Sequence, residues 1–270
     1  MTKGCYHLAT VKPIVDSPRV ATAYTATDLL FNWYAFEIPK GAFAIKSLQM
    51  IVAGTEGVAA NAKDIELIFA KSIDGAAPPS LGIVNNKLSD GNTLTKAIAT
   101  AARPHIIGYK FIDASAMKDV GVDLVAYELL GDAGGTEENN NMNMVLEGDP
   151  NFVGDSTHSA TTHGYQTIWV AAIANEGGED FGTGVIIDAA EGYAAGVTSL
   201  NCDGVAGDLV FAPGDELIAQ DGALIGIVKT VSDDGSHTTI VLESGLTAAL
   251  ANDDEVCLRR PYTFHFGIEY

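Results

Sequence analysis

Apolar residues in the first two thirds of the chain recur at every second position or form short runs, and Gly, Pro and Asp separate the runs. One run is rich in aromatic and β-branched residues and ends in a Pro-Lys-Gly turn, as expected of a strand followed by a tight connection. In the next run, Leu48, Met50 and Val52 fall on one strand face. The pattern predicts strands over residues 29–38, 44–52, 64–70, 106–112, 123–129 and 165–173.

Two segments between these strands do not follow the pattern. Residues 93–102 (TLTKAIATAA) predict one short helix. Residues 131–164 are polar and Asn-rich, and a loop of this length in a compact domain often contacts a partner or ligand. A contact loop and a solvated surface loop both remain open for this segment.

Residues 183–258 look like a second module of short strands. Two Asp-Gly pairs, at 221–222 and 234–235, each lie between strand-like runs and predict hairpins. Several short strands in so few residues are typical of a small barrel. We expect strands over residues 197–200, 214–219, 223–231, 238–242 and 254–258.

The C-terminal segment is a strongly alternating strand that needs a sheet to cover its apolar face. That face carries Tyr262, Phe264, Phe266, Ile268 and Tyr270. We infer that this strand rejoins the first sheet, so that residues 183–258 are an insertion. The predicted fold is all-β: a jelly-roll-like β-sandwich of residues 1–182, completed by residues 259–270, with an inserted small acidic β-barrel-like module.

Acidic residues dominate the charge balance. The chain has 35 Asp and Glu against 15 Lys and Arg, a formal net charge of −20. Residues 183–258 hold thirteen acidic residues against Lys229 alone, a net charge of −12. Such a surface repels nucleic acid and anionic membranes. We expect the module to face water, because a like-charged interface costs several kcal/mol.

No apolar run reaches the length of a membrane span, and the first residues lack the apolar core of a secretory signal. We therefore expect neither. The three cysteines, Cys5, Cys202 and Cys257, are isolated in sequence, and we interpret them as buried thiols outside any disulfide framework.

The N-terminal arm has the opposite charge. Residues 1–24 contain Lys3, Lys12 and Arg19 against Asp16, a net charge of +2. An arm of this kind is suited to docking on an acidic neighbour, so these three basic residues are candidate contacts. The alternative is an ordinary edge strand.

The search for chemistry finds no catalytic motif. There is no phosphate-binding loop, nucleophile elbow or zinc-protease helix motif. His158 and His163 lie five residues apart and lack a third ligand. The acidic turns at 176–180, 232–235 and 252–255 do not match a calcium-binding EF-hand loop, so we interpret them as solvated turns. We expect no catalytic residue, no cofactor and no metal.

Four aromatic residues have two readings. Trp33, Tyr34, Phe36 and Trp169 would suit a sugar-binding platform if they were exposed. Each lies in a strand with apolar neighbours, which favours packing in the core.

A family resemblance adds a functional expectation. The carrying segments are VTSLNCDG (197–204), FAPGDELIAQDGALIGIVKTV (211–231) and TTIVLESGLTAALANDDEV (238–256), together with the opening KGCYHLATVKPIVDSP (3–18). The module resembles one that recurs in structural proteins of tailed bacteriophages. The shared features are hairpin sequences covering about a quarter of the chain, and they supply no site residues.

The resemblance implies a non-enzymatic capsid decoration (cement) protein that bridges and stabilises neighbouring capsid subunits. Its partner would be the major capsid protein of the same particle, and the chain would form a homo-oligomer, with a trimer suggested by the threefold sites of icosahedral shells. The expected location is the capsid exterior, after assembly in the host cytoplasm. Lys3, Lys12, Arg19 and the loop 131–164 are the candidate capsid contacts. The alternatives are a tail, neck or vertex component, or a carbohydrate- or receptor-binding β module.

Overall fold

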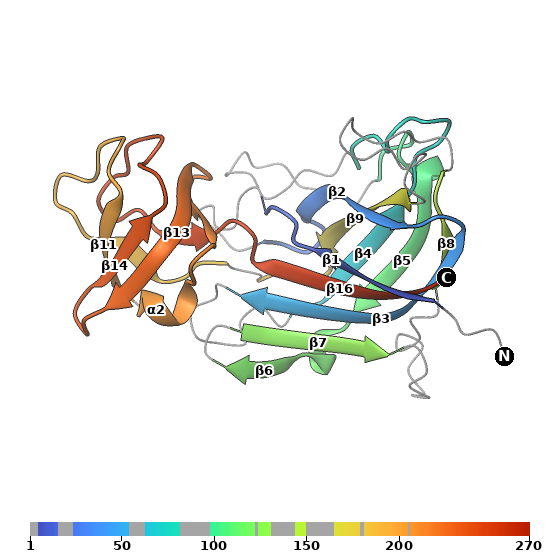
Figure 1. The fold of residues 1–270 in the computed structure, drawn as a ribbon, viewed down its shortest axis with the longest axis horizontal. Coiled ribbons are helices and arrows are strands. Elements are labelled where there is room, and N and C mark those ends of the chain that lie inside the picture. Colours follow the sequence, from blue (N-terminus) through green and yellow to red (C-terminus); the bar gives the residue numbers. More distant parts are fainter. Residues whose placement is uncertain are drawn as a thin grey trace.

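Antiparallel β-sheets make up nearly all of the chain (Figure 1). The computed structural model describes residues 5–15, 24–53, 63–81, 98–121, 124–130, 144–149, 165–178, 181–204 and 206–270. Within these described ranges, three short helical segments accompany the strands: η2 (Arg103–His105), η3 (Ala114–Ala116) and α2 (Gly207–Val210). No helix in the described part of the chain is long and apolar enough to cross a membrane.

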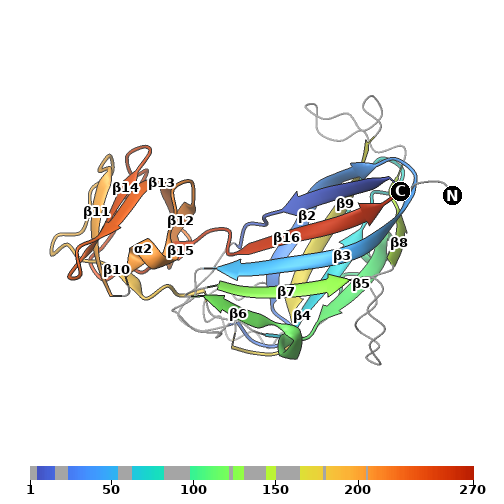
Figure 2. The same cartoon turned by 60° about the horizontal axis from the view of Figure 1, so that its bottom comes forward.

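Two sheets form a sandwich (Figure 2). The first sheet contains, in spatial order, β1 (Tyr6–Val11), β16 (Tyr262–Glu269), β3 (Ala42–Ala53), β7 (Leu124–Leu130) and β6 (Lys118–Gly121), and β8 (Met144–Glu147) also pairs with β3. The second sheet contains β2 (Leu29–Pro39), β9 (Tyr165–Ala174), β4 (Ile65–Ala70) and β5 (Ile106–Ile112).

The strand pairing has the nested order of a jelly roll. If β6, β8 and the inserted module are set aside, the first strand pairs with the last (β1 with β16) and the second with the second last (β2 with β9). The inner pairs β3–β7 and β4–β5 complete the series. A long antiparallel ribbon rolled onto itself gives this order. The predicted all-β class is confirmed, as are the predicted strands of the sandwich and the return of the C-terminal strand to the first sheet.

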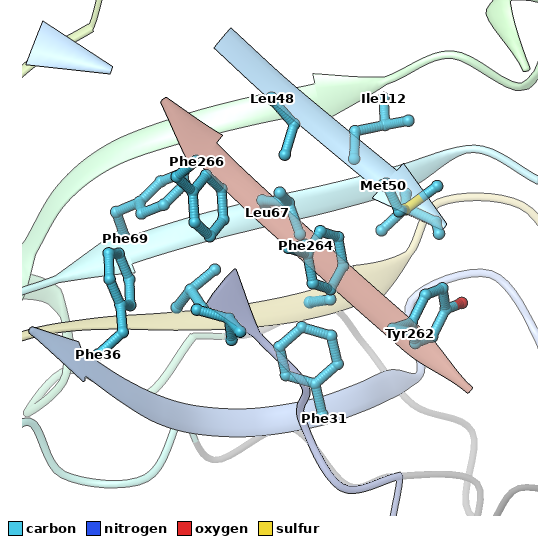
Figure 3. Close-up of a cluster of buried hydrophobic side chains, with 14 of the residues drawn as sticks. Phe31, Phe36, Leu48, Met50, Leu67, Phe69, Ile112, Tyr262, Phe264 and Phe266 are labelled. Atoms are coloured by element: carbon cyan, nitrogen blue, oxygen red, sulfur yellow. The ribbon is translucent and has the colours of Figure 1, made fainter. Parts of the chain in front are cut away.

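The aromatic face of β16 fills the space between the two sheets (Figure 3). Phe266 stacks on Phe36 at a ring-centroid distance of 5.3 Å and meets Phe69 edge-on at 5.5 Å. Further along the strand, Phe264 and Tyr262 contact Phe31. Because β16 lies between β1 and β3, its alternate side chains face the second sheet, which buries them completely. Of the predicted apolar face, only Tyr270 is exposed.

The central strands of the second sheet are covered on both faces. Every residue of β4 and all but the first residue of β9 are buried. Ile68, Ala171 and Ile173 face away from the sandwich core and pack against Leu81 and Ala102, which lie outside the strands. This second cluster explains why these two strands read as continuous apolar runs and not as alternating ones.

One expectation about an irregular segment needs correction, and another falls largely outside the described residues. Of the possible helix 93–102, residues 93–97 are not described, and residues 98–102 contain a turn. The predicted loop 131–164 contains a strand, β8, because Met144 and Leu146 pack into the sandwich core. Residues 131–143 and 150–164 lie outside the described residues.

Residues 183–258 form a small, nearly closed barrel with its own core. The strand order is β10 (Val185–Ile187), β11 (Ser199–Gly204), β14 (Thr238–Leu242), β13 (Leu224–Asp233), β12 (Glu216–Ala219) and β15 (Val256–Leu258). A bridge between Ile186 and Glu255 brings β10 to β15. The five predicted strands and both Asp-Gly hairpins are confirmed; β10 was not predicted. The apolar core of this barrel is separate from that of the sandwich.

A cluster of charged groups joins the barrel to the sandwich. The Glu216 carboxylate lies 3.1 Å from Nη1 of Arg259 and 3.2 Å from Nε of Arg260. Arg260 also donates hydrogen bonds to the backbone oxygen of Lys12 at 2.6 Å and to Tyr34 Oη at 3.4 Å. Arg260 therefore links a barrel carboxylate directly to two elements of the sandwich.

Replacing Glu216 with glutamine should loosen this connection. The carboxylate is three-quarters buried and accepts two charge-assisted contacts, so we expect a loss of about 1–2 kcal/mol in the free energy of unfolding. Cleavage by trypsin after Arg259 should become faster; Pro261 protects the bond after Arg260. The matched control is Glu243→Gln, an exposed barrel carboxylate. Equal stability and cleavage rates in the two variants would show that the cluster does not join the two parts.

Candidate interaction surface

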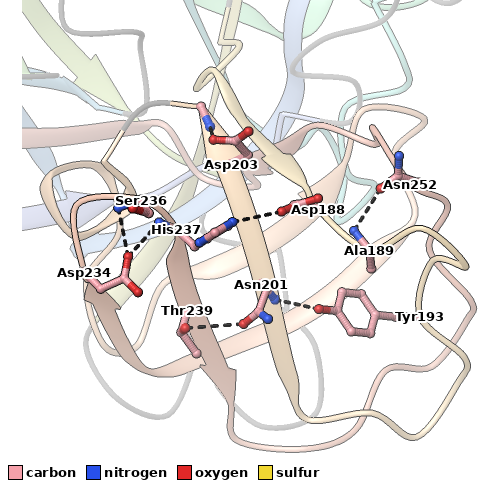
Figure 4. A network of polar contacts seen from close by, with 11 residues as sticks. Asp188, Ala189, Tyr193, Asn201, Asp203, Asp234, Ser236, His237, Thr239 and Asn252 are labelled. Carbon is pink, nitrogen blue, oxygen red and sulfur yellow. Dashed lines mark hydrogen bonds and ion pairs between the residues drawn. The ribbon is translucent and has the colours of Figure 1, made fainter.

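The acidic turns of the barrel bind their own backbone (Figure 4). One carboxylate oxygen of Asp234 accepts the N–H groups of Ser236 and His237, both at 2.8 Å. These hydrogen bonds hold the pKa of Asp234 below its usual value. The ring Nε2 of His237 lies 3.2 Å from Asp188, and Asp254 accepts the N–H of Ala251. The carboxylates of Asp234 and Asp254 therefore stabilise the turns in which they lie.

The described residues contain no group of three or more potential metal ligands. His158 and His163 lie outside the described residues. Among the four aromatic residues considered for a sugar platform, Phe36 and Trp169 are buried. Trp33 donates its indole N–H to the backbone oxygen of Pro79 at 2.7 Å. Core packing is therefore the correct reading for Phe36 and Trp169.

The cysteines differ sharply in accessibility. All three are free thiols, and Cys202 and Cys257 are completely buried in the barrel, as expected. The expectation of a buried thiol is wrong for Cys5, which precedes the edge strand β1 and is exposed. Burial raises the pKa of Cys202 to about 12, and the nearby Asp188 charge adds to the shift. The barrel thiols are therefore poor nucleophiles in the folded protein.

Titration with Ellman's reagent at pH 8 should count one fast thiol per folded chain and three after unfolding. A group with a pKa of about 12 is ionised to roughly one part in ten thousand at pH 8, and burial further blocks the reagent. Cys5→Ser should abolish the fast phase. Rapid labelling of a second thiol in the folded chain would contradict the buried positions of Cys202 and Cys257.

Bulky apolar side chains are exposed on the outer face of the first sheet, at the end that holds both chain termini. Tyr6 is 73 % exposed, Leu8 64 % and Val145 69 %. We call these three residues the terminal patch. The other exposed bulky apolar residues of the described chain are Tyr109 on β5, Tyr165 at the start of β9, Tyr270 after β16, and Leu209, Leu224 and Ile227 on the barrel.

Register places the terminal patch on one face. Tyr6 pairs with Glu269 of β16, Glu269 with Ala44 of β3, and Ala44 with Val145 of β8. Residues paired directly across neighbouring strands share a sheet face, so this row runs across four strands. Within the row, the Glu269 carboxylate lies 3.3 Å from Nζ of Lys46 and accepts a hydrogen bond from Tyr6 Oη.

A groove of about 420 Å³ lies beside this row, with Leu8, Ser47 and Gly267 in its lining. A Cβ atom at position 267 would come within 2.2 Å of Ser47 Oγ. A side chain at this position would displace the Ser47 hydroxyl and occupy the floor of the groove. The remaining lining residues are Tyr6, His7, Lys46 and Ile268.

Of the three predicted contact residues, the structure describes only Lys12. Lys3 and Arg19 lie outside the described residues. Lys12 is exposed, but it lies beside the barrel and away from the terminal patch, in a polar groove with Asp215, Glu216 and Arg260. Burial raises the pKa of Asp215, and the positive charge of Lys12 opposes that shift. Residues 6–11 form an edge strand. This is the arrangement expected from the sequence as the alternative to a docking arm.

Comparisons with family models and with curated proteins find no relative. No family model matches the chain, and no curated protein is similar to it at a significant level. The geometry of the described residues is therefore the basis for a functional proposal.

Proposed function

We propose that this chain is a non-enzymatic structural protein of a virion that decorates the capsid exterior and bridges neighbouring capsid subunits. The terminal patch carries the proposal: three bulky apolar side chains stand exposed on a regular sheet face. Exposed apolar clusters of this kind mark protein contacts. The partner is the major capsid protein of the same particle, which assembles in the host cytoplasm.

The distribution of charge supports this orientation. The barrel, with its net charge of −12, stands at the end of the sandwich opposite the chain termini (Figure 1). A chain that contacts a shell through the terminal patch leaves the barrel in water. An orientation in which the barrel contacts the shell would be opposed by like-charge repulsion and by the desolvation of carboxylates.

The fold supplies a rigid support for such a contact. Jelly rolls recur in viral capsid proteins and in lectins, so the patch, and not the fold, favours one role over the other. Binding of the folded chain to two subunits at once stabilises the shell by mass action and needs no chemistry. A specific contact of this type buries roughly 1,200–2,000 Å².

Cosedimentation with purified particles from the same source tests the proposal. We expect the wild-type chain to bind, and Val145→Lys to lower the bound fraction at least tenfold, because a lysine ammonium would have to be desolvated in the contact. The matched control is Leu209→Lys, an equally drastic change at an exposed barrel residue, which should bind as wild type. Equal binding of the two variants would remove the terminal patch from the contact, and no binding of the wild-type chain would contradict decoration.

A further inference from the structure

Strand β1 ends the first sheet without the features that protect sheet edges. It pairs with β16 in unbroken register and contains no Asp, Glu, Lys, Arg or Pro. Natural edges usually carry charges, prolines or bulges that prevent pairing with another chain. The pairings of the edge strands β2, β5 and β6 are each interrupted by a bulge, and Lys110 and Lys118 lie in β5 and β6. The edge strand β8 has only four residues and ends in Glu147.

The free side of β1 presents backbone groups at alternate residues. Cys5 and Tyr270 exchange both backbone hydrogen bonds, so the antiparallel alternation directs the N–H and C=O groups of Tyr6, Leu8 and Thr10 away from β16. None of the described strands pairs with this side. All three residues are exposed.

We propose that β1 pairs antiparallel with β1 of a second copy of this chain, with Leu8 at the twofold axis. In this register Leu8 lies opposite the same residue of the second copy, and Tyr6 lies opposite Thr10 of the second copy. The three outward residues of each strand then satisfy one another's backbone groups. The side chains of Tyr6 and Leu8 from both copies form one continuous apolar strip on the outer face of the joined sheet.

The distribution of charge is compatible with a second copy as the occupant. Each chain has a net charge of −20, yet two copies meet here through strands that carry no carboxylate. Strand β1 runs from the end with the termini towards the barrel (Figure 1). Antiparallel pairing therefore places the two barrels, each with a net charge of −12, at opposite ends of the dimer, where their repulsion is weakest. The inference does not depend on the virion role.

Light scattering coupled to size-exclusion chromatography of the full chain tests the pairing. We expect a mass of twice 28.2 kDa for the wild type and the single-chain mass for Leu8→Lys, which places two ammonium groups at the twofold axis. The matched control is Gln49→Lys, at an exposed position of β3, which should remain dimeric. Thermal unfolding of each variant verifies the fold. A wild-type monomer at every concentration, or a dimer that persists in Leu8→Lys, would overturn the proposal.

Disulfide trapping tests the register. In a Cys5→Ser background, Leu8→Cys places two thiols on directly opposed residues, about 5.5 Å apart at Cα, within the range that a disulfide spans. Thr10→Cys, in the same background, places its thiol opposite Tyr6 of the second copy. Mild oxidation should cross-link Leu8→Cys and leave Thr10→Cys uncross-linked. Equal cross-linking of the two would indicate random encounters and contradict the register.

Discussion

Replacing Phe266 with alanine is expected to lower the free energy of unfolding by about 3–5 kcal/mol. The Phe266 ring is completely buried and packs against Phe36, Phe69 and Phe264 with centroid distances of 5.3, 5.5 and 6.1 Å. Its removal leaves a cavity between two sheets that cannot collapse independently. Urea or guanidinium unfolding, followed by tryptophan fluorescence, measures the loss.

The control for this variant is Thr263→Ala on the same strand. Thr263 points to the outer face of the first sheet and is only partly buried, so we expect a change below about 1 kcal/mol. If the two variants were equally stable, the ring of Phe266 would not lie between the sheets, and the jelly-roll pairing would be wrong.

Gly204→Ala is expected to lower the stability of the barrel by roughly 2–4 kcal/mol. Gly204 adopts a φ of +99°, and a Cβ atom there would lie 1.9 Å from the backbone oxygen of Gly184. The position of the Cβ is fixed by the backbone of residue 204, and the Gly184 oxygen is itself a backbone atom. The clash therefore cannot be relieved by rotation of a side chain. The change in the unfolding midpoint, read from the same denaturant titration, measures the effect.

A second glycine separates steric conflict from backbone conformation. Gly235 has a φ of +84° and open space around the position of a Cβ atom. Gly235→Ala therefore retains only the conformational strain, and we expect a loss of about 1 kcal/mol. Equal losses at the two positions would contradict the close approach of Gly204 to Gly184.

The sequence predicts most strands because each has to bury a face. In β16 the large side chains alternate without exception, so both the strand and its inward face follow from the pattern. The pairing of β16 with β1 and β3 depends on the path of the whole chain, which a local pattern does not contain. For β4 and β9, a second cluster covers the outer face and removes the alternation.

The terminal patch is hidden from sequence reasoning by the pattern of β1. Its bulky apolar residues, Tyr6 and Leu8, face outward, while the smaller Ala9 and Val11 face the core. Hydrophobicity alone would assign the opposite faces. Val145 was assigned to a loop because β8 is only four residues long and follows an Asn-rich stretch. The one sequence feature that points to the terminal patch is the absence of charged side chains from residues 6–11.

Charge reasoning identified Lys12 as a residue that faces an acidic neighbour, and Asp215 of the barrel is such a neighbour within the same chain. Net charge along a segment indicates the sign of a partner. It does not tell whether that partner belongs to another protein. The roles of Lys3, Lys12 and Arg19 in capsid contact stay predictions.

The most direct test of the virion role is quantitative mass spectrometry of purified particles from the source, with copies of this chain counted against the most abundant shell protein. A decoration protein should occur at a fixed ratio to the shell protein, either one or a simple fraction of one. A few copies per particle would contradict decoration and indicate a tail, neck or vertex position. Absence from the particles would contradict the virion role itself.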